Sequence, residues 1–192
     1  MVARGAGMGT ARLVALAALA AVVALAPATA RPADPPTDRD VKAAFLYRFT
    51  QYVEWPTAAF ESPDSPVVLG VLGDAAYVQV IAASAGGKSA GGRPIVVRQL
   101  QSPSGAVGCH VVFVGASQAA AVPAIVRAVS ASPVLTVSDA AEFAKAGGAV
   151  GFVVRNGKVA FQINVGAAGR AGLKVSSKLL RLAEIVEEER RA

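Results

Sequence analysis

Five short apolar runs, separated by segments of mixed composition, are the feature of this sequence that most constrains its fold. They cover residues 67–73, 95–100, 110–115, 134–137 and 150–154. Several of them are apolar on both faces, as strands must be when helices cover both sides of a sheet. We therefore expect an α/β fold with a central, largely parallel sheet flanked by helices.

Helices are expected between some of these runs, at 75–84, 117–130 and 140–146. An earlier helix is predicted from Thr37 to about Val53, because Thr37 and Asp40 have the spacing of a capping box. Its apolar residues recur every three or four positions and predict one buried stripe, made of Val41, Phe45, Phe49, Tyr52 and Val53. A last helix is predicted from Ser176, with a broad apolar face made of Leu179, Leu180, Leu182, Ala183, Ile185 and Val186.

An antiparallel edge hairpin is predicted near the C-terminus. Residues 158–164 alternate apolar with mostly polar side chains, which is typical of a half-exposed strand. Asn156 and Gly157 join this strand to the run at 150–154, and this dipeptide readily adopts the positive φ values of a tight hairpin turn. The sheet should therefore end in these two strands.

The first thirty residues have the three parts of a cleavable export signal. Arg4 and Arg12 precede a fourteen-residue apolar run at 13–26, which is shorter than the ~20 residues that span a bilayer. The run is followed by Ala28-Thr29-Ala30, a small-x-small cleavage site. An uncleaved anchor is the alternative, but the proline-rich stretch after Ala30 does not lengthen the apolar run. We expect a linker at 31–37 and a single domain at 38–192, outside the cytoplasm and not inserted in the membrane.

The charges and the rare reactive residues exclude several classes of function. Cleavage of the signal removes two arginines and lowers the net charge from +6 to +4, with basic residues spread along the chain, so nucleic-acid binding is not expected. The one cysteine and the one histidine are Cys109 and His110, which point to opposite faces of a strand and cannot share a zinc ion. No Gly-x-Ser-x-Gly motif is present. We therefore expect no enzymatic activity, no metal and no cofactor, and we expect Cys109 to be a buried thiol or an intermolecular link.

Two groups of residues remain as candidate sites. Gly73, Asp74 and Asp139 follow predicted strands, and ligands of open α/β sheets gather at the ends of strands. They suggest a small-ligand site, although Asp139 has no identifiable catalytic partner. The second group lies in the hairpin and in the loop before the last helix, and it suggests a surface for binding another protein: Phe152, Arg155, Phe161, Ile163, Leu173 and Lys174. The alternative is a solvated basic stripe, Lys174, Lys178 and Arg181, over a core helix.

Four stretches resemble the YfiR family of periplasmic regulators. They are 41–56 (VKAAFLYRFTQYVEWP), 109–115 (CHVVFVG), 133–148 (PVLTVSDAAEFAKAGG) and 172–183 (GLKVSSKLLRLA). Together they extend over nearly the whole chain after residue 38, and the first and last stretches are the most specific.

The resemblance implies a non-enzymatic α/β protein that restrains a membrane-bound diguanylate cyclase by binding its periplasmic sensor region. Release of the cyclase would raise cyclic-di-GMP and promote biofilm formation, and the protein would be a homodimer. Relatives can carry paired cysteines that form redox-sensitive disulfides. This chain has Cys109 alone, so that mode of regulation within one chain is not expected. With Phe161 and Leu173 on the surface, Phe161→Asp and Leu173→Asp should abolish partner binding and leave the fold intact.

Overall fold

The computed structural model describes residues 35–189. The predicted export signal at 1–30 and most of the predicted linker lie outside these residues. The strands are β1 (Val53–Glu54), β2 (Val67–Leu72), β3 (Ser89–Ala90), β4 (Arg93–Gln99), β5 (Val111–Val114), β6 (Leu135–Ser138), β7 (Val150–Arg155), β8 (Lys158–Asn164), β9 (Lys174–Val175) and β10 (Glu184–Val186). The helices are α2 (Asp38–Tyr52), α3 (Ala75–Ala85), α4 (Val122–Ala128), α5 (Val165–Arg170) and α6 (Ser177–Leu180), with short 3₁₀ turns at Thr57–Ala59, Pro103–Ala106 and Ala116–Ala121.

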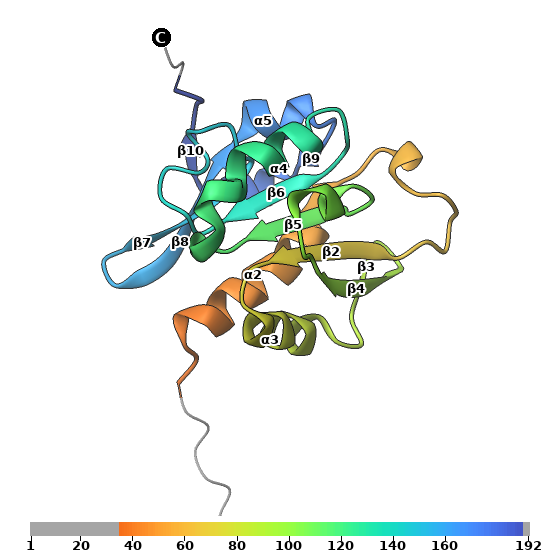
Figure 1. The fold of residues 1–192 in the computed structure, drawn as a ribbon, viewed down its shortest axis with the longest axis horizontal. Helices are drawn as coiled ribbons and strands as arrows, with labels where there is room; N and C mark the ends of the chain where they lie inside the picture. Colours follow the sequence, from red (N-terminus) through yellow and green to blue (C-terminus); the bar gives the residue numbers. More distant parts are fainter. Residues whose placement is uncertain (1–34, 190–192) are drawn as a thin grey trace, which may run out of the picture. The chain divides into compact units, whose positions relative to one another are not determined.

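The main sheet has the strand order β10-β8-β7-β6-β5-β2-β4-β3 (Figure 1). The strands from β4 to β7 run parallel, whereas β8 is antiparallel to β7 and β3 is antiparallel to β4. A separate two-stranded sheet pairs β1 with β9. The predicted fold class, a largely parallel sheet flanked by helices with an antiparallel hairpin near the C-terminus, is confirmed.

Two hydrophobic layers cover the two faces of the sheet. Helices α2 and α3 pack on one face, over buried residues such as Leu69, Phe113 and Ile163. Helix α4 packs on the other face with Val112 and Val114. The strands with both faces covered are the ones that the sequence shows as continuous apolar runs.

Helix α2 begins as predicted. The hydroxyl of Thr37 accepts a hydrogen bond from the Asp40 N–H, and the Asp40 carboxylate accepts one from the Thr37 N–H, which completes the capping box. The predicted buried stripe is only partly correct. The fully buried residues of α2 are Ala43, Leu46, Phe49 and Thr50, whereas Val41, Phe45 and Tyr52 lie at the edge of the core and are half-buried.

One predicted helix is absent and another is much shorter than expected. Residues 140–146 form a series of turns in which Glu142 adopts a φ of 56°, and the backbone carbonyl of Ala144 accepts a hydrogen bond from the Asn164 side chain. The predicted helix from Ser176 is only one turn long, and Ile185 and Val186 form β10 instead, paired with β8. In both segments a contact with a distant strand overrides the local preference for helix.

The predicted helix at 117–130 is also shorter than expected. A 3₁₀ turn occupies Ala116–Ala121, and the α-helix begins only at Val122, with Pro123 in its first turn. Proline is tolerated at this position because the N–H groups of the first turn have no partner within the helix.

The hairpin is confirmed, but its position at the edge of the sheet is only partly correct. Asn156 and Gly157 have φ values of 52° and 70°, as the predicted turn requires. Strand β10 lies beyond β8 and pairs with its second half, at residues 162–164. That half of β8 is also buried rather than half-exposed, because Gln162 and Asn164 form hydrogen bonds with Glu184 and Ala144.

Candidate partner-binding surface

The apolar residues of the predicted partner surface lie inside the protein. Phe152, Phe161 and Ile163 are 5%, 2% and 0% exposed, and Leu173 is 5% exposed. The ring of Phe161 lies 5.1 Å from that of Phe45 and 5.2 Å from that of Phe49, between ring centroids. The expectation that these four side chains are on the surface is therefore wrong. Strand alternation indicates which residues share a face, but the packing of α2 over the hairpin decides that this face is buried.

Arg155 and Lys174 are the two members of that group that solvent reaches. Arg155 ends β7, and its side chain is 54% exposed and pairs with Glu184 at 2.8 Å. Lys174 is exposed on β9, where its backbone lies opposite Glu54 of β1. The two basic side chains are therefore accessible, whereas the four apolar members of the group are buried.

An apolar groove, which the sequence did not predict, runs between α2 and the segment around α6. Its volume is about 480 Å³, and its walls are Pro36, Asp40, Val41, Ala44, Phe45, Arg48, Tyr52, Leu179 and Leu182. Leu182 is 69% exposed, the highest value among the exposed large hydrophobic residues in the described part of the chain. The sequence contains one indication of the groove, because the apolar residues of α2 cover a wider arc than one buried stripe needs.

The three residues of the predicted ligand site lie at the ends of parallel strands, as expected. β2 continues through α3 to β4 on one side, and β5 continues through α4 to β6 on the other, so Gly73 and Gly115 follow the two strands where the winding reverses. Open α/β sheets bind ligands at this point. Asp139 follows β6 on the same edge.

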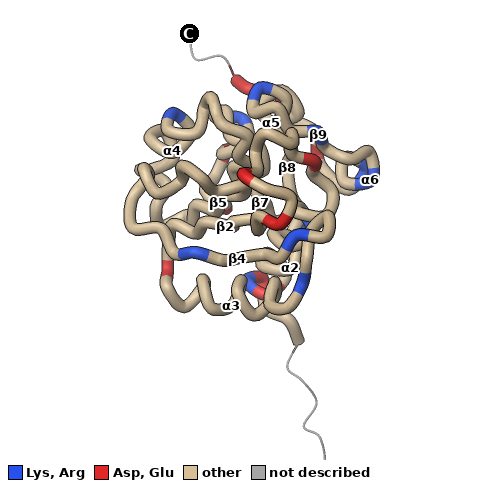
Figure 2. Tube along the Cα trace, turned by 90° about the vertical axis from the view of Figure 1, so that its right-hand side faces the viewer, with Lys and Arg blue, Asp and Glu red and all other residues tan. Residues whose placement is uncertain are grey.

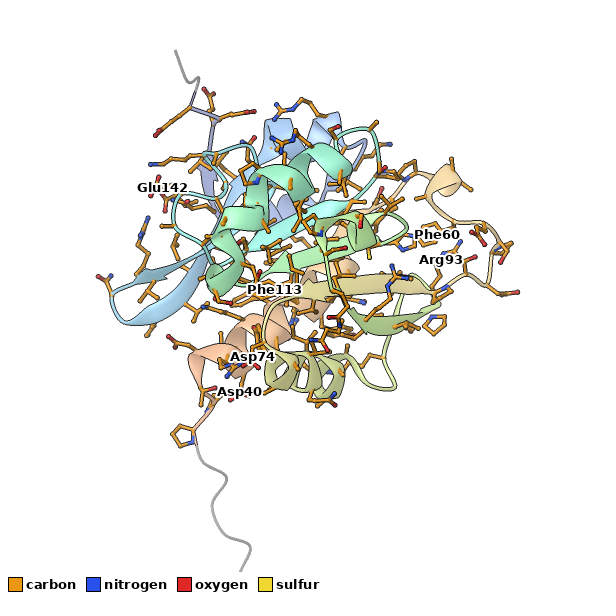
Figure 3. All side chains as sticks on the ribbon, viewed as in Figure 1. Asp40, Phe60, Asp74, Arg93, Phe113 and Glu142 are labelled. Carbon is orange, nitrogen blue, oxygen red and sulfur yellow. The ribbon has the colours of Figure 1, made fainter. Side chains whose placement is uncertain are left out.

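The carboxylates at this edge are occupied by other parts of the chain. Asp139 accepts hydrogen bonds from the Ala116 N–H at 2.6 Å and from the Lys42 ammonium at 2.8 Å. Asp74 accepts one from Ala76 N–H at the start of α3 and pairs with Arg39 at 2.6 Å, beside α2 in Figure 3. Both interactions involve α2, so this helix covers the place where an α/β protein would receive a ligand.

Tyr77 completes the contacts between α2 and α3. Its hydroxyl donates a hydrogen bond to the Arg39 carbonyl at 3.3 Å, and the Arg39 guanidinium lies 4.9 Å from the centre of its ring. Burial, and secondarily the charge of Asp139, raise the pKa of Tyr77 above its usual value. Tyr77 therefore stays protonated and acts as a hydrogen-bond donor.

His110, directly before β5, holds the loop between β1 and β2. Its Nδ1 accepts a hydrogen bond from the Val68 N–H at 3.1 Å, and its Nε2 lies 3.0 Å from the Ala59 carbonyl. The carbonyl can only accept, so the ring is neutral with its proton on Nε2. Phe60 stacks on the ring at 4.4 Å, and Arg93 lies 3.8 Å from the centre of Phe60, as Figure 3 shows for the last two side chains.

This environment makes the stability of the protein depend on pH near neutrality. Burial lowers the pKa of His110, the hydrogen bond to Ala59 opposes this shift, and the charge of Arg93 adds to it. Below about pH 6.5, His110 therefore binds a proton in the unfolded chain more readily than in the folded chain. The free energy of unfolding should fall as the pH drops below that value. The contribution is at most about 1.4 kcal/mol per pH unit.

Urea unfolding between pH 7.5 and pH 5 measures this effect. In His110→Asn the amide oxygen can replace Nδ1 as acceptor and cannot titrate, so this variant should show a smaller loss of stability over the range. An equal loss in both proteins would show that His110 is not the group responsible.

Within residues 35–189, no three His, Cys, Asp or Glu residues are placed to hold a metal ion together. None of the helices described there has the length and apolar character needed to cross a membrane. Cys109 is buried, which agrees with the expectation of a buried thiol. Its Sγ lies 3.2 Å from the Arg98 guanidinium.

The fold and the contacts at its strand ends define an open α/β protein in which the carboxylates at the usual ligand position pair with side chains of α2. The chain belongs to the YfiR/HmsC-like family, whose model matches residues 39–184. This match confirms the resemblance seen in the sequence, and it fits a regulator of diguanylate cyclase. The search of curated proteins found no match.

Proposed function

We propose that this protein is a periplasmic regulator that binds the sensor region of a membrane diguanylate cyclase and represses it. The match of residues 39–184 to the YfiR/HmsC-like family carries this proposal. The protein acts as a binding partner and not as an enzyme, it functions as a homodimer, and an export signal at residues 1–30 delivers it to the periplasm. Its activity lowers cyclic-di-GMP signalling and biofilm formation.

The mechanism requires only a difference in affinity. A membrane cyclase that exchanges between an active and an inactive state is shifted toward the state that its partner binds more tightly. A shift from one per cent to ninety-nine per cent inactive requires about 10⁴-fold tighter binding to the inactive state. The regulator never needs to meet the nucleotide, which is made on the other side of the membrane.

Arg155 and Lys174 are the proposed contacts on the regulator. Both are exposed, and both lie on strands held in place by the buried aromatic cluster and by the β1–β9 pair. Removing an exposed charge at an interface mainly changes the rate of association and its salt dependence.

Binding of the exported protein to the purified periplasmic region of a candidate cyclase tests this proposal. The wild type should bind, and the double variant Arg155→Glu, Lys174→Glu should bind at least ten times more weakly. Arg127→Glu, on α4, is a single charge-reversal control and should bind like the wild type. No binding by the wild type to any cyclase of the source organism would refute the partner, and equal binding by the double variant would refute the assigned surface.

A further inference from the structure

Backbone contacts fix the position of α6 against α2, the two segments that line the groove. The Ser176 N–H donates a hydrogen bond to the Tyr52 carbonyl at 2.8 Å, which fastens the start of α6 to the end of α2. Next to this contact, Val53 and Glu54 of β1 pair with Val175 and Lys174 of β9. A groove fixed in this way needs little ordering when a partner binds, and this favours affinity.

The size and lining of the groove suit a short peptide segment. From Asp40 to Tyr52 the wall formed by α2 is about 18 Å long at 1.5 Å per residue, enough for about three turns of helix. Its volume of about 480 Å³ accommodates several side chains. Most of its walls are apolar, from Val41, Phe45, Leu179 and Leu182 among others.

One positive charge lies in the wall of the groove, and two more lie on residues adjacent in sequence to its walls. Arg48 is exposed in its wall, and Lys178 and Arg181 are exposed next to Leu179 and Leu182. Figure 2 shows basic positions on α6. In the described part of the chain, none of these three side chains takes part in an ion pair, whereas Asp74, Asp139, Glu142, Glu184, Glu188 and Glu189 are all paired with other cations.

The acidic residue of the groove does not neutralise these charges. Asp40 is at the start of α2, almost a whole helix away from Tyr52, and its carboxylate accepts hydrogen bonds from the Thr37 N–H and hydroxyl at 2.8 and 2.7 Å. These hydrogen bonds lower the pKa of Asp40. The Asp40 carboxylate, at one end of the groove, is therefore already hydrogen-bonded to Thr37. The charge near Arg48 and α6 is positive.

We propose that this groove docks an acidic amphipathic segment of a partner protein, with apolar side chains in the groove and carboxylates facing Arg48, Lys178 and Arg181. Helix-in-groove recognition of this kind uses apolar anchors at positions i, i+3 or i+4 and i+7. The inference deepens the proposed function and rests on it only for the identity of the partner, which would carry such a segment in its periplasmic region.

A library of random twelve-residue peptides displayed on phage tests the groove without any cyclase. Selection on the exported protein should recover peptides with more Asp and Glu than Lys and Arg, and with apolar residues spaced i, i+3 or i+4. The best synthetic peptide should bind at least ten times more weakly to Leu182→Asp and to Arg48→Glu. Replacing its acidic residues by lysine should restore binding to Arg48→Glu.

Two variants at exposed positions away from the groove serve as matched controls. Val107→Asp places a charge at a side chain that is 60% exposed, and Arg127→Glu reverses a charge on α4; both should bind the peptide within twofold of the wild type. Circular dichroism of Leu182→Asp should match the wild type, since this side chain is largely in solvent.

Four results would overturn the inference. The first two are recovered peptides without an acidic excess and equal binding of the peptide by the groove variants. The third is conversion of a dimer to a monomer by Leu182→Asp, which would assign the groove to a second copy of this chain. The fourth is wild-type binding to vesicles of equimolar phosphatidylcholine and phosphatidylglycerol that Leu182→Asp loses, which would assign the groove to a lipid surface. Because the library contains no cyclase, such a failure leaves the proposed regulation of a cyclase to its own test.

Discussion

Replacing Phe161 with aspartate should unfold the protein. The side chain is 2% exposed, and its ring lies in a cluster with Phe45, Phe49 and Phe152. Deleting a buried phenylalanine ring costs about 3–5 kcal/mol, and a carboxylate in its place would have no partner in an apolar environment. A loss of at least about 4 kcal/mol is expected from a total that is about 5–15 kcal/mol for a domain. Circular dichroism and urea unfolding measure it.

Val154→Asp is the matched control on the same hairpin. Val154 lies two residues from Phe152 along β7 and is 55% exposed, so the free energy of unfolding should change by less than about 0.5 kcal/mol. An unchanged urea midpoint for Phe161→Asp would contradict the packing described above. If the protein does unfold, loss of partner binding in this variant would say nothing about a contact surface.

The hairpin shows which features of the fold can be predicted from the sequence and which cannot. The Asn156-Gly157 turn and the alternation of β8 follow from backbone preferences that a short segment carries by itself, and both were predicted. Whether the face that carries Phe161 is covered depends on α2, more than a hundred residues earlier in the sequence. The same limit explains why four buried residues were predicted to lie on the surface.

The prediction of a long C-terminal helix was wrong for a related reason. From Leu179 to Val186 the spacing of apolar residues suits a helix, and the pairing of Ile185 with Ile163 is invisible in a local pattern. Polar residues of both hairpin strands hold the start of β10, because Gln162 of β8 donates a hydrogen bond to Glu184 at 3.1 Å and Arg155 of β7 pairs with the same carboxylate. The strand is favoured there by its backbone pairing with β8 from Glu184 to Val186.

The candidate sites were predictable to different degrees. The strand ends at Gly73, Asp74 and Asp139 were located correctly, because parallel strands share one carboxyl edge. Their engagement by Lys42 and Arg39 of α2 required the tertiary structure. The α2–α6 groove brings together two segments about 130 residues apart, and no local pattern predicts such a juxtaposition.

Deleting the gene should raise intracellular cyclic-di-GMP several-fold if the proposed repression operates. The cyclase would lose the partner that favours its inactive state. The ratio of active to inactive cyclase would then rise by the same factor by which binding had lowered it. Quantification of cyclic-di-GMP by mass spectrometry in extracts of wild-type and deletion strains measures this effect. Full-length protein supplied on a plasmid should restore the wild-type level.

The most direct test compares this complementation on the two sides of the membrane. Full-length protein should lower cyclic-di-GMP in the deletion strain, whereas residues 31–192 with a new initiator methionine, produced at equal abundance in the cytoplasm, should leave it high. A full-length protein carrying Arg155→Glu and Lys174→Glu should be exported and folded but should also leave it high. Repression by the cytoplasmic form, or an unchanged cyclic-di-GMP level on deletion, would contradict regulation of a cyclase from the periplasm.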